Sequence, residues 1–443
     1  MNTLNKTQEL FDFIEQCPTA YQTICTLRDE LVARGFAELE EHHEWDVRAG
    51  GNYFVTRNGS SLIAFRVPAD TASVTGYQMI ATHSDSPSFK LKPSFEKKAE
   101  GNCVQWNVER YGGMICSSWM DRPLSVAGRV VVADQTGVRT VPVHLRRDLA
   151  IIPNVAIHMD RSVNEGKKFN PQVDMLPLAG LQSEQNDLMQ MIAAELGVKV
   201  ADIVSHDLFL YVRDAGKSVG INQEFVCAPR LDDLMCTYAA LQGFIDSAPQ
   251  KAIAVLAVFD NEEIGSSSRQ GAASSLLRDV LTRLDGALFG TGTGSLERRL
   301  ASSVLLSADN AHAVHPNHPE YADASNRPVM GGGIVIKYNA EQRYATDAVS
   351  AAVFERICAA ADVETQSFAN RSDIRGGSTL GNIAVSDLPA LTVDIGLAQL
   401  AMHSAFETAS ADDLCSLMKA SKTFYQSSVT AVHDGEYRVY TEK

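Results

Sequence analysis

The sequence has no Cys-x-x-Cys pair and no long apolar run. Its eight cysteines are scattered along 443 residues, so their spacing indicates neither a zinc knuckle nor a disulfide framework. No apolar stretch approaches the roughly 20 residues that cross a bilayer. The N-terminal stretch Met1–Cys17 also lacks the apolar region and cleavage site of a signal peptide. These absences predict a cytoplasmic protein with reduced thiols and no membrane partner.

Basic residues are also in deficit. The chain has 39 Lys and Arg against 54 Asp and Glu, which gives a formal net charge of -15. Such an acidic surface argues against nucleic acid and anionic membranes as partners. It does not exclude a small acidic substrate, because charges farther away than a Debye length of about 8 Å are largely screened. The hydrophobic content of 45% is ordinary for a globular protein, and the length suggests two or three domains.

The most informative stretch is the apolar run Ala252–Phe259 with the residues that follow it. The run is rich in Val and Ala and too short for a typical helix, so it predicts a strand buried on both faces of a sheet. Glu262 and Glu263 come directly after it, and Gly265 allows the backbone to turn. Open α/β sheets bind ligands at the carboxyl ends of their strands. The two carboxylates are therefore candidates for chemistry, although most Glu-Glu pairs on loops are simply solvated.

Other candidates occupy the same kind of position in the chain. Short apolar strands precede His83, Asp309 and His403, and Asp232 opens an amphipathic helix. Two imidazoles and several carboxylates on one sheet edge form a nitrogen and oxygen donor set suited to two Zn²⁺, Mn²⁺ or Co²⁺ ions. Asp85 lies two residues after His83 and can orient a metal-binding ring. Taken singly, Asp232 can equally be a helix cap, and His83 a loop residue.

The pattern along the chain predicts an α/β fold with an insertion. Residues 1–93 and 228–443 alternate strands with amphipathic helices and form one discontinuous α/β domain. Residues 94–227 are dominated by strand and turn signals, and we interpret them as an inserted β-rich domain. Expected elements include hairpins within 52–67 and 130–143, and helices over 183–196, 272–284, 347–361 and 411–428.

Three histidines near position 315 invite a metal interpretation. His312, His315 and His318 follow the strand that ends at Asp309, but Pro316 interrupts any helix that would align them. Packing within a loop, or support of other ligands, is the favoured interpretation. The segment Gly290–Gly294 is interpreted as a loop, since it lacks the Gly-Lys-Ser/Thr ending of a phosphate-binding loop.

Five ordered motifs give the chain a family resemblance over nearly its whole length. They are THSDSP, PRLDDL, DNEEIGS, SADNAHAVHPN and MHS, which contain the candidate residues named above. With these motifs the sequence resembles the aspartyl aminopeptidase family of co-catalytic metallopeptidases. The resemblance implies a doubly wound peptidase domain interrupted by a β-rich dimerisation domain, and dimers that assemble into tetrahedral dodecamers.

The resemblance also implies roles for individual residues. Two divalent metal ions, Zn²⁺ above all with Mn²⁺ or Co²⁺ as alternatives, would share Asp232. One ion would also be held by His83 and Asp309, and the other by Glu263 and His403. Glu262 would be the general base and Asp85 the partner of His83. The implied substrates are peptides with a free N-terminal Asp or Glu, and the implied substrate-binding residues are Lys337, Tyr344, Met402 and, from a neighbouring subunit, His158.

Two other functions remain open at this stage. The same ligand set would serve a deblocking aminopeptidase or an N-acyl amino acid deacylase. A non-catalytic assembly protein could also retain the oligomeric shell without the chemistry.

Overall fold

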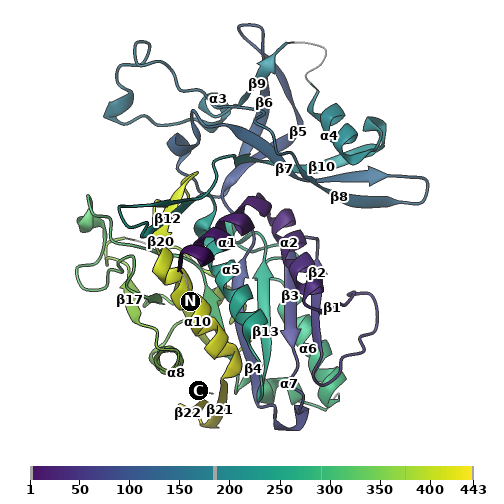
Figure 1. Cartoon of the computed structure of the whole chain (residues 1–443), viewed down its shortest axis with the longest axis vertical. Coiled ribbons are helices and arrows are strands. Elements are labelled where there is room, and N and C mark those ends of the chain that lie inside the picture. The colour runs from purple at the N-terminus through teal and green to yellow at the C-terminus, as the bar shows by residue number, and fades with distance from the viewer. Residues whose placement is uncertain (1–2, 183–186, 291, 375, 442–443) are drawn as a thin grey trace.

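The computed structural model describes residues 3–182, 187–290, 292–374 and 376–441. Within these residues the largest sheet has nine strands (Figure 1). They are β1 (Ala37–Glu38), β2 (Asn52–Arg57), β3 (Ser61–Arg66), β4 (Gly76–His83), β13 (Ala252–Phe259), β14 (Val304–Ala308), β16 (Ile334–Tyr338), β17 (Thr365–Ala369) and β18 (Leu391–Gly396). Their spatial order is β1-β2-β3-β13-β4-β14-β18-β16-β17.

The centre of this sheet is parallel. Strand β4 pairs in parallel with β13 on one side and with β14 on the other, and β14 pairs in parallel with β18. Strands β3 and β16 run antiparallel to their neighbours β13 and β18. The predicted doubly wound mixed sheet is therefore confirmed, and its four central strands end on the same edge.

Helices cover both faces of the sheet. One face packs against α1 (Thr3–Gln16), α2 (Ala20–Ala33), α5 (Leu231–Asp246), α8 (Ala348–Ala360) and α10 (Ala411–Gln426), and the other against α6 (Leu276–Phe289), α7 (Ser295–Leu300) and α9 (Leu380–Ala384). In β13, Leu256 and Val258 contribute to the first core, while Ile253 and Val255 contribute to the second. Because both faces are covered, every residue of β13 is buried, which explains its continuous apolar sequence.

A second, antiparallel sheet is built from residues between Ser88 and Val212, and we call it the inserted sheet. Its strands are β5 (Ser88–Ala99), β6 (Cys103–Tyr111), β7 (Leu124–Ala133), β8 (Val138–His144), β9 (Leu178–Leu181) and β10 (Ile203–Val212), in the order β8-β7-β10-β5-β6-β9. It has its own apolar core, to which Phe89, Trp106 and Leu208 belong, and it lies above the large sheet in Figure 1. The assignment of residues 94–227 to a separate domain stays a prediction.

Smaller elements complete the chain. The short helix α3 (Pro171–Asp174) and the helix α4 (Leu188–Leu196) accompany the inserted sheet. A five-stranded sheet joins β11 (Lys217–Val219), β12 (Phe225–Ala228), β20 (Glu407–Ser410), β19 (Ala398–Leu400) and β15 (Ala311–His312), and β21 (Ser428–His433) pairs with β22 (Glu436–Tyr440).

Both predicted hairpins form, as β2 with β3 and as β7 with β8, whereas some predicted boundaries were wrong. Helix α6 begins at Leu276 rather than at residue 272. The residues before it form turns, in which the N–H of Ala273 donates to the carbonyl of Ser266 at 3.3 Å. Of the helix expected over 183–196, the structure has Leu188–Leu196, and residues 183–186 lie outside the described residues. Thr291 of the expected loop at 290–294 also lies outside them.

All eight cysteines lie in the described part of the chain and are free thiols. Within the described residues, no helix has the length and apolar character that crossing a bilayer requires.

Candidate metal centre

Parallel strands bring acidic and imidazole side chains together at one edge of the large sheet. His83 is the last residue of β4, and Asp309 directly follows β14. Phe259, the last residue of β13, pairs with His83 across the sheet, so the turn with Glu262 and Glu263 leaves the sheet beside that histidine. Because parallel strands end on the same side, side chains that are distant in the sequence meet at this edge.

Asp232 supplies the carboxylate between the two histidines. It is the second residue of α5, where the backbone is still non-helical, with φ -82° and ψ 108°. Its Oδ1 lies 3.4 Å from Nε2 of His83, and its Oδ2 lies 3.4 Å from Nε2 of His403. One carboxylate thus presents a different oxygen to each of the two imidazoles.

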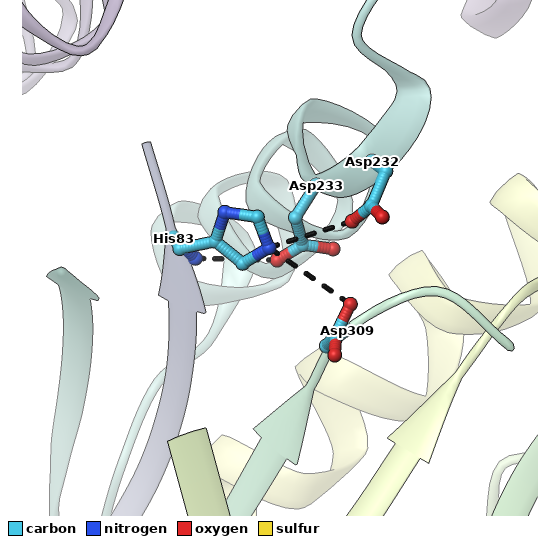
Figure 2. A group of neighbouring side chains, drawn as sticks. All are labelled: His83, Asp232, Asp233 and Asp309. Carbon is cyan, nitrogen blue, oxygen red and sulfur yellow. Dashed lines mark hydrogen bonds and ion pairs between the residues drawn. The ribbon is translucent and has the colours of Figure 1, made fainter. Parts of the chain in front are cut away.

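Two groups of potential ligands share this aspartate. In the first, Nε2 of His83 also lies 3.9 Å from Oδ1 of Asp309 (Figure 2). In the second, Nε2 of His403 lies 3.3 Å from Oε2 of Glu263. The ligand atoms within each group lie within 4.8 Å of one another. The geometry brings together all five residues expected to bind metal.

Strong electrostatic coupling marks the cluster. Burial lowers the pKa of His83, but its contacts with Asp232, Asp309 and Asp85 outweigh burial and raise that pKa well above its ordinary value. Burial raises the pKa of Asp232, but its contacts with His403 and His83 outweigh burial and lower that pKa. The charged forms of His83 and Asp232 thus favour each other.

Unpartnered oxygen atoms test whether the residues fit a metal ion. Among the described residues, Oε1 of Glu263 is buried and accepts no hydrogen bond, and Oδ1 of Asp232, also buried, has the 3.4 Å contact with Nε2 of His83 but no hydrogen bond. A buried carboxylate oxygen without a partner is unfavourable, and a divalent cation would supply the missing contact. Imidazole nitrogens with carboxylate oxygens are also ligands that zinc accepts. The residues present therefore fit a metal centre.

His83 is oriented from its other ring nitrogen. Nδ1 lies 3.0 Å from the backbone carbonyl of Asp85 and 3.5 Å from the Oδ1 atom of the same residue. The shorter contact is thus made by the carbonyl rather than by the carboxylate. A ring nitrogen that donates to this carbonyl leaves Nε2 free to face the metal centre.

The carboxylate of Asp85 holds the Glu262–Glu263 turn. Its Oδ1 accepts the backbone N–H of Glu262 at 3.1 Å, and its Oδ2 accepts the backbone N–H of Glu263 at 3.2 Å. Asp85 therefore contacts His83 on one side and the paired glutamates on the other.

The pKa of Glu262 is raised to about 8, mainly by burial, with Asp309 and Asp85 adding to the rise and His83 opposing it. The same kind of environment raises the pKa of Glu263 well above its ordinary value. Both rises follow from burial close to several other carboxylates.

Two supporting carboxylates were not predicted from the sequence. Glu407 accepts the backbone N–H of Asp232 at 3.0 Å and that of His403 at 2.7 Å, so it fixes two candidate ligands at once. Nothing in the sequence pattern distinguishes it. Asp233 accepts the backbone N–H of His83 at 3.2 Å, and its position directly after Asp232 was an available signal.

Known proteins share this arrangement of sequence and fold. A family model described as Aminopeptidase I zinc metalloprotease (M18) matches residues 13–425. The chain belongs to the M18 aminopeptidase family. The family resemblance stated from the motifs is thereby confirmed, and the protein is a metallo-aminopeptidase.

Individual relatives cover nearly all of the chain. A probable M18 family aminopeptidase 2 of Clostridium acetobutylicum is 43% identical over 430 residues, which are 96% of this chain and 99% of that protein. The structure of the Ape4 and Nbr1 complex matches with a TM-score of 0.91 at 35% identity, covering 96% of this chain and 86% of that one. The S. cerevisiae mApe1 dodecamer matches with a TM-score of 0.83 at 28% identity, covering 96% and 99%.

The residues expected to bind substrate lie in different surroundings in this M18 chain. Lys337 on β16 is buried, and its Nζ lies 3.3 Å from Oδ2 of Asp309 and 5.7 Å from the ring centroid of Tyr344. Met402 directly precedes His403 and is half-buried, whereas His158 is exposed on the loop after β8. The structure thus brings Lys337 and Tyr344 close to a candidate ligand.

None of the three clustered histidines joins a ligand group within the described residues. His312 faces the ring of Phe368 at 6.1 Å, and His318 stacks on Tyr321 at 5.1 Å. His318 lies in a loop, as the favoured interpretation expects, whereas His312 belongs to β15.

Metal content tests the shared position of Asp232. We expect the purified protein to bind about two zinc ions per chain, Asp232→Ala to bind almost none, and His403→Ala to keep about one, because only the aspartate serves both groups. Elemental analysis after dialysis against Zn²⁺ measures this. His318→Ala, on an exposed ring, is the control and should match the unmodified protein. Retention of two ions by Asp232→Ala would contradict the shared role.

Proposed function

We propose that the protein removes N-terminal Asp and Glu residues from peptides by a reaction that requires two divalent metal ions. The supporting observation is the carboxylate of Asp232, whose two oxygens each lie 3.4 Å from a different histidine. An aspartate between two ligand groups is what a pair of metal ions sharing one carboxylate requires. Membership of the M18 family supports the zinc chemistry, and the number of ions and the acidic preference are the proposal.

Five residues would hold the metal ions. His83 and Asp309 would bind one ion, Glu263 and His403 the other, and Asp232 both. Zn²⁺ is the expected metal, with Mn²⁺ and Co²⁺ as alternatives that accept the same donors. When bound, such ions polarise a peptide carbonyl and lower the pKa of water toward neutrality.

Glu262 is the proposed general base. Its carboxylate takes a proton from the attacking water and later gives that proton to the leaving amine. The raised pKa of about 8 reflects burial among other carboxylates. Nearby cations favour the charged form of a carboxyl group, so metal binding would return Glu262 to the ionised state that a base needs at neutral pH.

Cleavage only at the N-terminus would follow from the negative charge of the carboxylate cluster. The free α-amine of a peptide is positive, and a carboxylate of the cluster can pair with it. An internal peptide bond has no such charge, so it would not be held in the same way. This favours an exopeptidase.

Lys337 is the proposed partner of the acidic substrate side chain. Its ammonium group has three donors, and the contact with Asp309 uses one of them. Burial lowers the pKa of Lys337, but Asp309 and other negative neighbours outweigh burial and raise it, so the side chain stays charged. A hydrogen bond between charged groups in such a site contributes about 1.5–3 kcal/mol.

We further propose that the chain forms a homo-oligomer built from dimers, with a tetrahedral dodecamer as the complete assembly. The S. cerevisiae relative is named as a dodecamer. Apolar side chains are exposed around His158, with Ile157 47% and Met159 84% accessible, and such patches mark interaction surfaces. His158 would then reach the active site of a neighbour.

Eight free cysteines favour a reducing compartment, which supports a cytoplasmic location.

Removal of the base tests the mechanism. We expect Glu262→Gln to lower kcat by at least about 100-fold, as loss of a general base does, while zinc content stays near normal. Peptide hydrolysis and elemental analysis on the same preparation measure both. Chelation should abolish activity in the unmodified protein, and added Zn²⁺ should restore it. The exposed Glu320→Gln is the control, and a Glu262→Gln enzyme with nearly full activity would contradict the assignment.

Substrate preference tests Lys337. We expect Lys337→Ala to lower kcat/KM for an N-terminal Asp substrate about 10- to 100-fold more than for the matching Ala substrate, because only the former loses a charge-assisted contact. Lys337→Arg keeps the charge and should retain part of the preference. Equal losses on both substrates would reject the role. A panel including N-acyl amino acids separates this activity from that of a deacylase.

Light scattering tests the assembly. We expect the double change Ile157→Asp and Met159→Asp to reduce the particle mass well below that of a dodecamer, since buried charges disfavour an apolar interface. Val32→Asp, on the exposed side of α2, is the control. A double variant of unchanged mass would place the interface elsewhere.

A further inference from the structure

A cavity lies where the inserted sheet meets the large sheet. Its volume is about 450 Å³, and Tyr21, Asp85, Tyr111, Phe209 and Asn261 contribute to its wall. Asp85 lies at the edge of the large sheet that carries the candidate metal ligands, whereas Tyr111 and Phe209 belong to the inserted sheet. Polar side chains of both sheets, Asp85 and Tyr111 among them, therefore meet in the wall of this cavity.

Tyr111 makes the polar contact between them. It is the last residue of β6, and its ring meets the ring of Phe209 on β10 edge to face, with centroids 5.5 Å apart. Its hydroxyl donates to Oδ2 of Asp85 at 2.7 Å and accepts from Nδ2 of Asn261 at 2.8 Å. The inserted sheet thus holds the ring, while the hydroxyl contacts Asp85 and Asn261, which support the Glu262–Glu263 turn.

The two partners of this hydroxyl hold the turn from both sides. Asp85 accepts the backbone N–H groups of Glu262 and Glu263. Asn261 precedes them with a positive φ of 64°, and its Oδ1 accepts from Ser268 at 2.7 Å and Gln270 at 2.8 Å. The turn itself is a single 3₁₀ turn, Glu262–Ile264, so its position depends on these outside contacts.

The hydroxyl is a permanent donor. Burial raises the pKa of Tyr111, and the neighbouring Asp85 and Asp260 raise it further. The group therefore stays protonated at neutral pH, where it donates to Asp85.

We propose that Tyr111 is a positioning residue, and that through its hydroxyl the inserted sheet fixes Asp85, and with it the Glu262–Glu263 turn, in the geometry that catalysis needs. The expected effect on the reaction rate rests on the proposed function. The expected effect on the Glu262–Glu263 turn rests on the hydrogen bonds alone. It gives the inserted sheet a part in the reaction within its own subunit.

Tyr111→Phe tests the kinetic consequence. The expected result is a kcat lowered about 10-fold with KM changed less than about 2-fold, since a misplaced base slows the reaction without removing substrate contacts. Zinc content and particle mass should be unchanged. The matched control is Tyr21→Phe, whose hydroxyl lines the same cavity but donates to Asp207 at 3.2 Å. Equal kcat losses in the two variants would overturn the proposal.

Hydrogen exchange tests the structural consequence without relying on activity. In Tyr111→Phe, the amide protons of Glu262 and Glu263 should exchange about 10-fold faster than in the unmodified protein, while those of β13 do not change. Unchanged exchange at the turn would overturn the proposal even if the enzyme were slower. If the unmodified protein shows no metal-dependent hydrolysis, the proposed function fails, and the exchange result still decides the role of Tyr111.

Discussion

The structure depends on burying one carboxylate between two imidazoles. Asp232 is 3% exposed, and each of its oxygens faces a different histidine. A buried, unpaired charge is strongly unfavourable, whereas a paired one is tolerated if its remaining contacts are satisfied. Burial lowers the pKa of His83 and of His403, but contacts with Asp232 outweigh burial and raise both pKa values, which favours the charged imidazoles that balance the carboxylate. The same arrangement is suited to cations, because a metal ion replaces the protons and also supplies partners for the oxygens that have none.

Supporting contacts make this arrangement rigid. The side chain of Glu407 accepts backbone N–H groups from Asp232 and from His403, so one buried carboxylate orients both. Asp85 does the equivalent for Glu262 and Glu263. Burial raises the pKa of Glu407 to about 8, and the nearby Asp232 adds to this rise while the two N–H groups oppose it. Glu407 and Asp85 therefore fix the backbone of four residues of the candidate site.

The inserted sheet connects assembly with chemistry. Its β6 ends in Tyr111, which reaches Asp85, and the loop after β8 exposes the apolar patch around His158. The same region thus contacts Asp85, which holds the Glu262–Glu263 turn, and carries the exposed residues that are proposed to contact other copies. A change in how the inserted sheet packs would alter the position of Tyr111 and of the loop that carries His158, because the ring of Tyr111 packs on Phe209 within that sheet.

The sequence by itself determined the buried parallel strands and the residues that follow them. A run such as Ala252–Phe259 is apolar at every position because both faces of its sheet are covered. His83, Glu263, Asp309 and His403 could be named as candidates because they follow such strands, which end together. Asp232 was a candidate at the start of a helix, and the assignment of these five residues to two metal ions came from the family resemblance. The roles of Glu407 and Tyr111 were decided only by the tertiary structure. Glu407 acts through backbone N–H groups, which leave no residue pattern, and Tyr111 reaches the site from a different sheet. The start of α6 was also misplaced, since turns within 266–275 compete with the helical pattern.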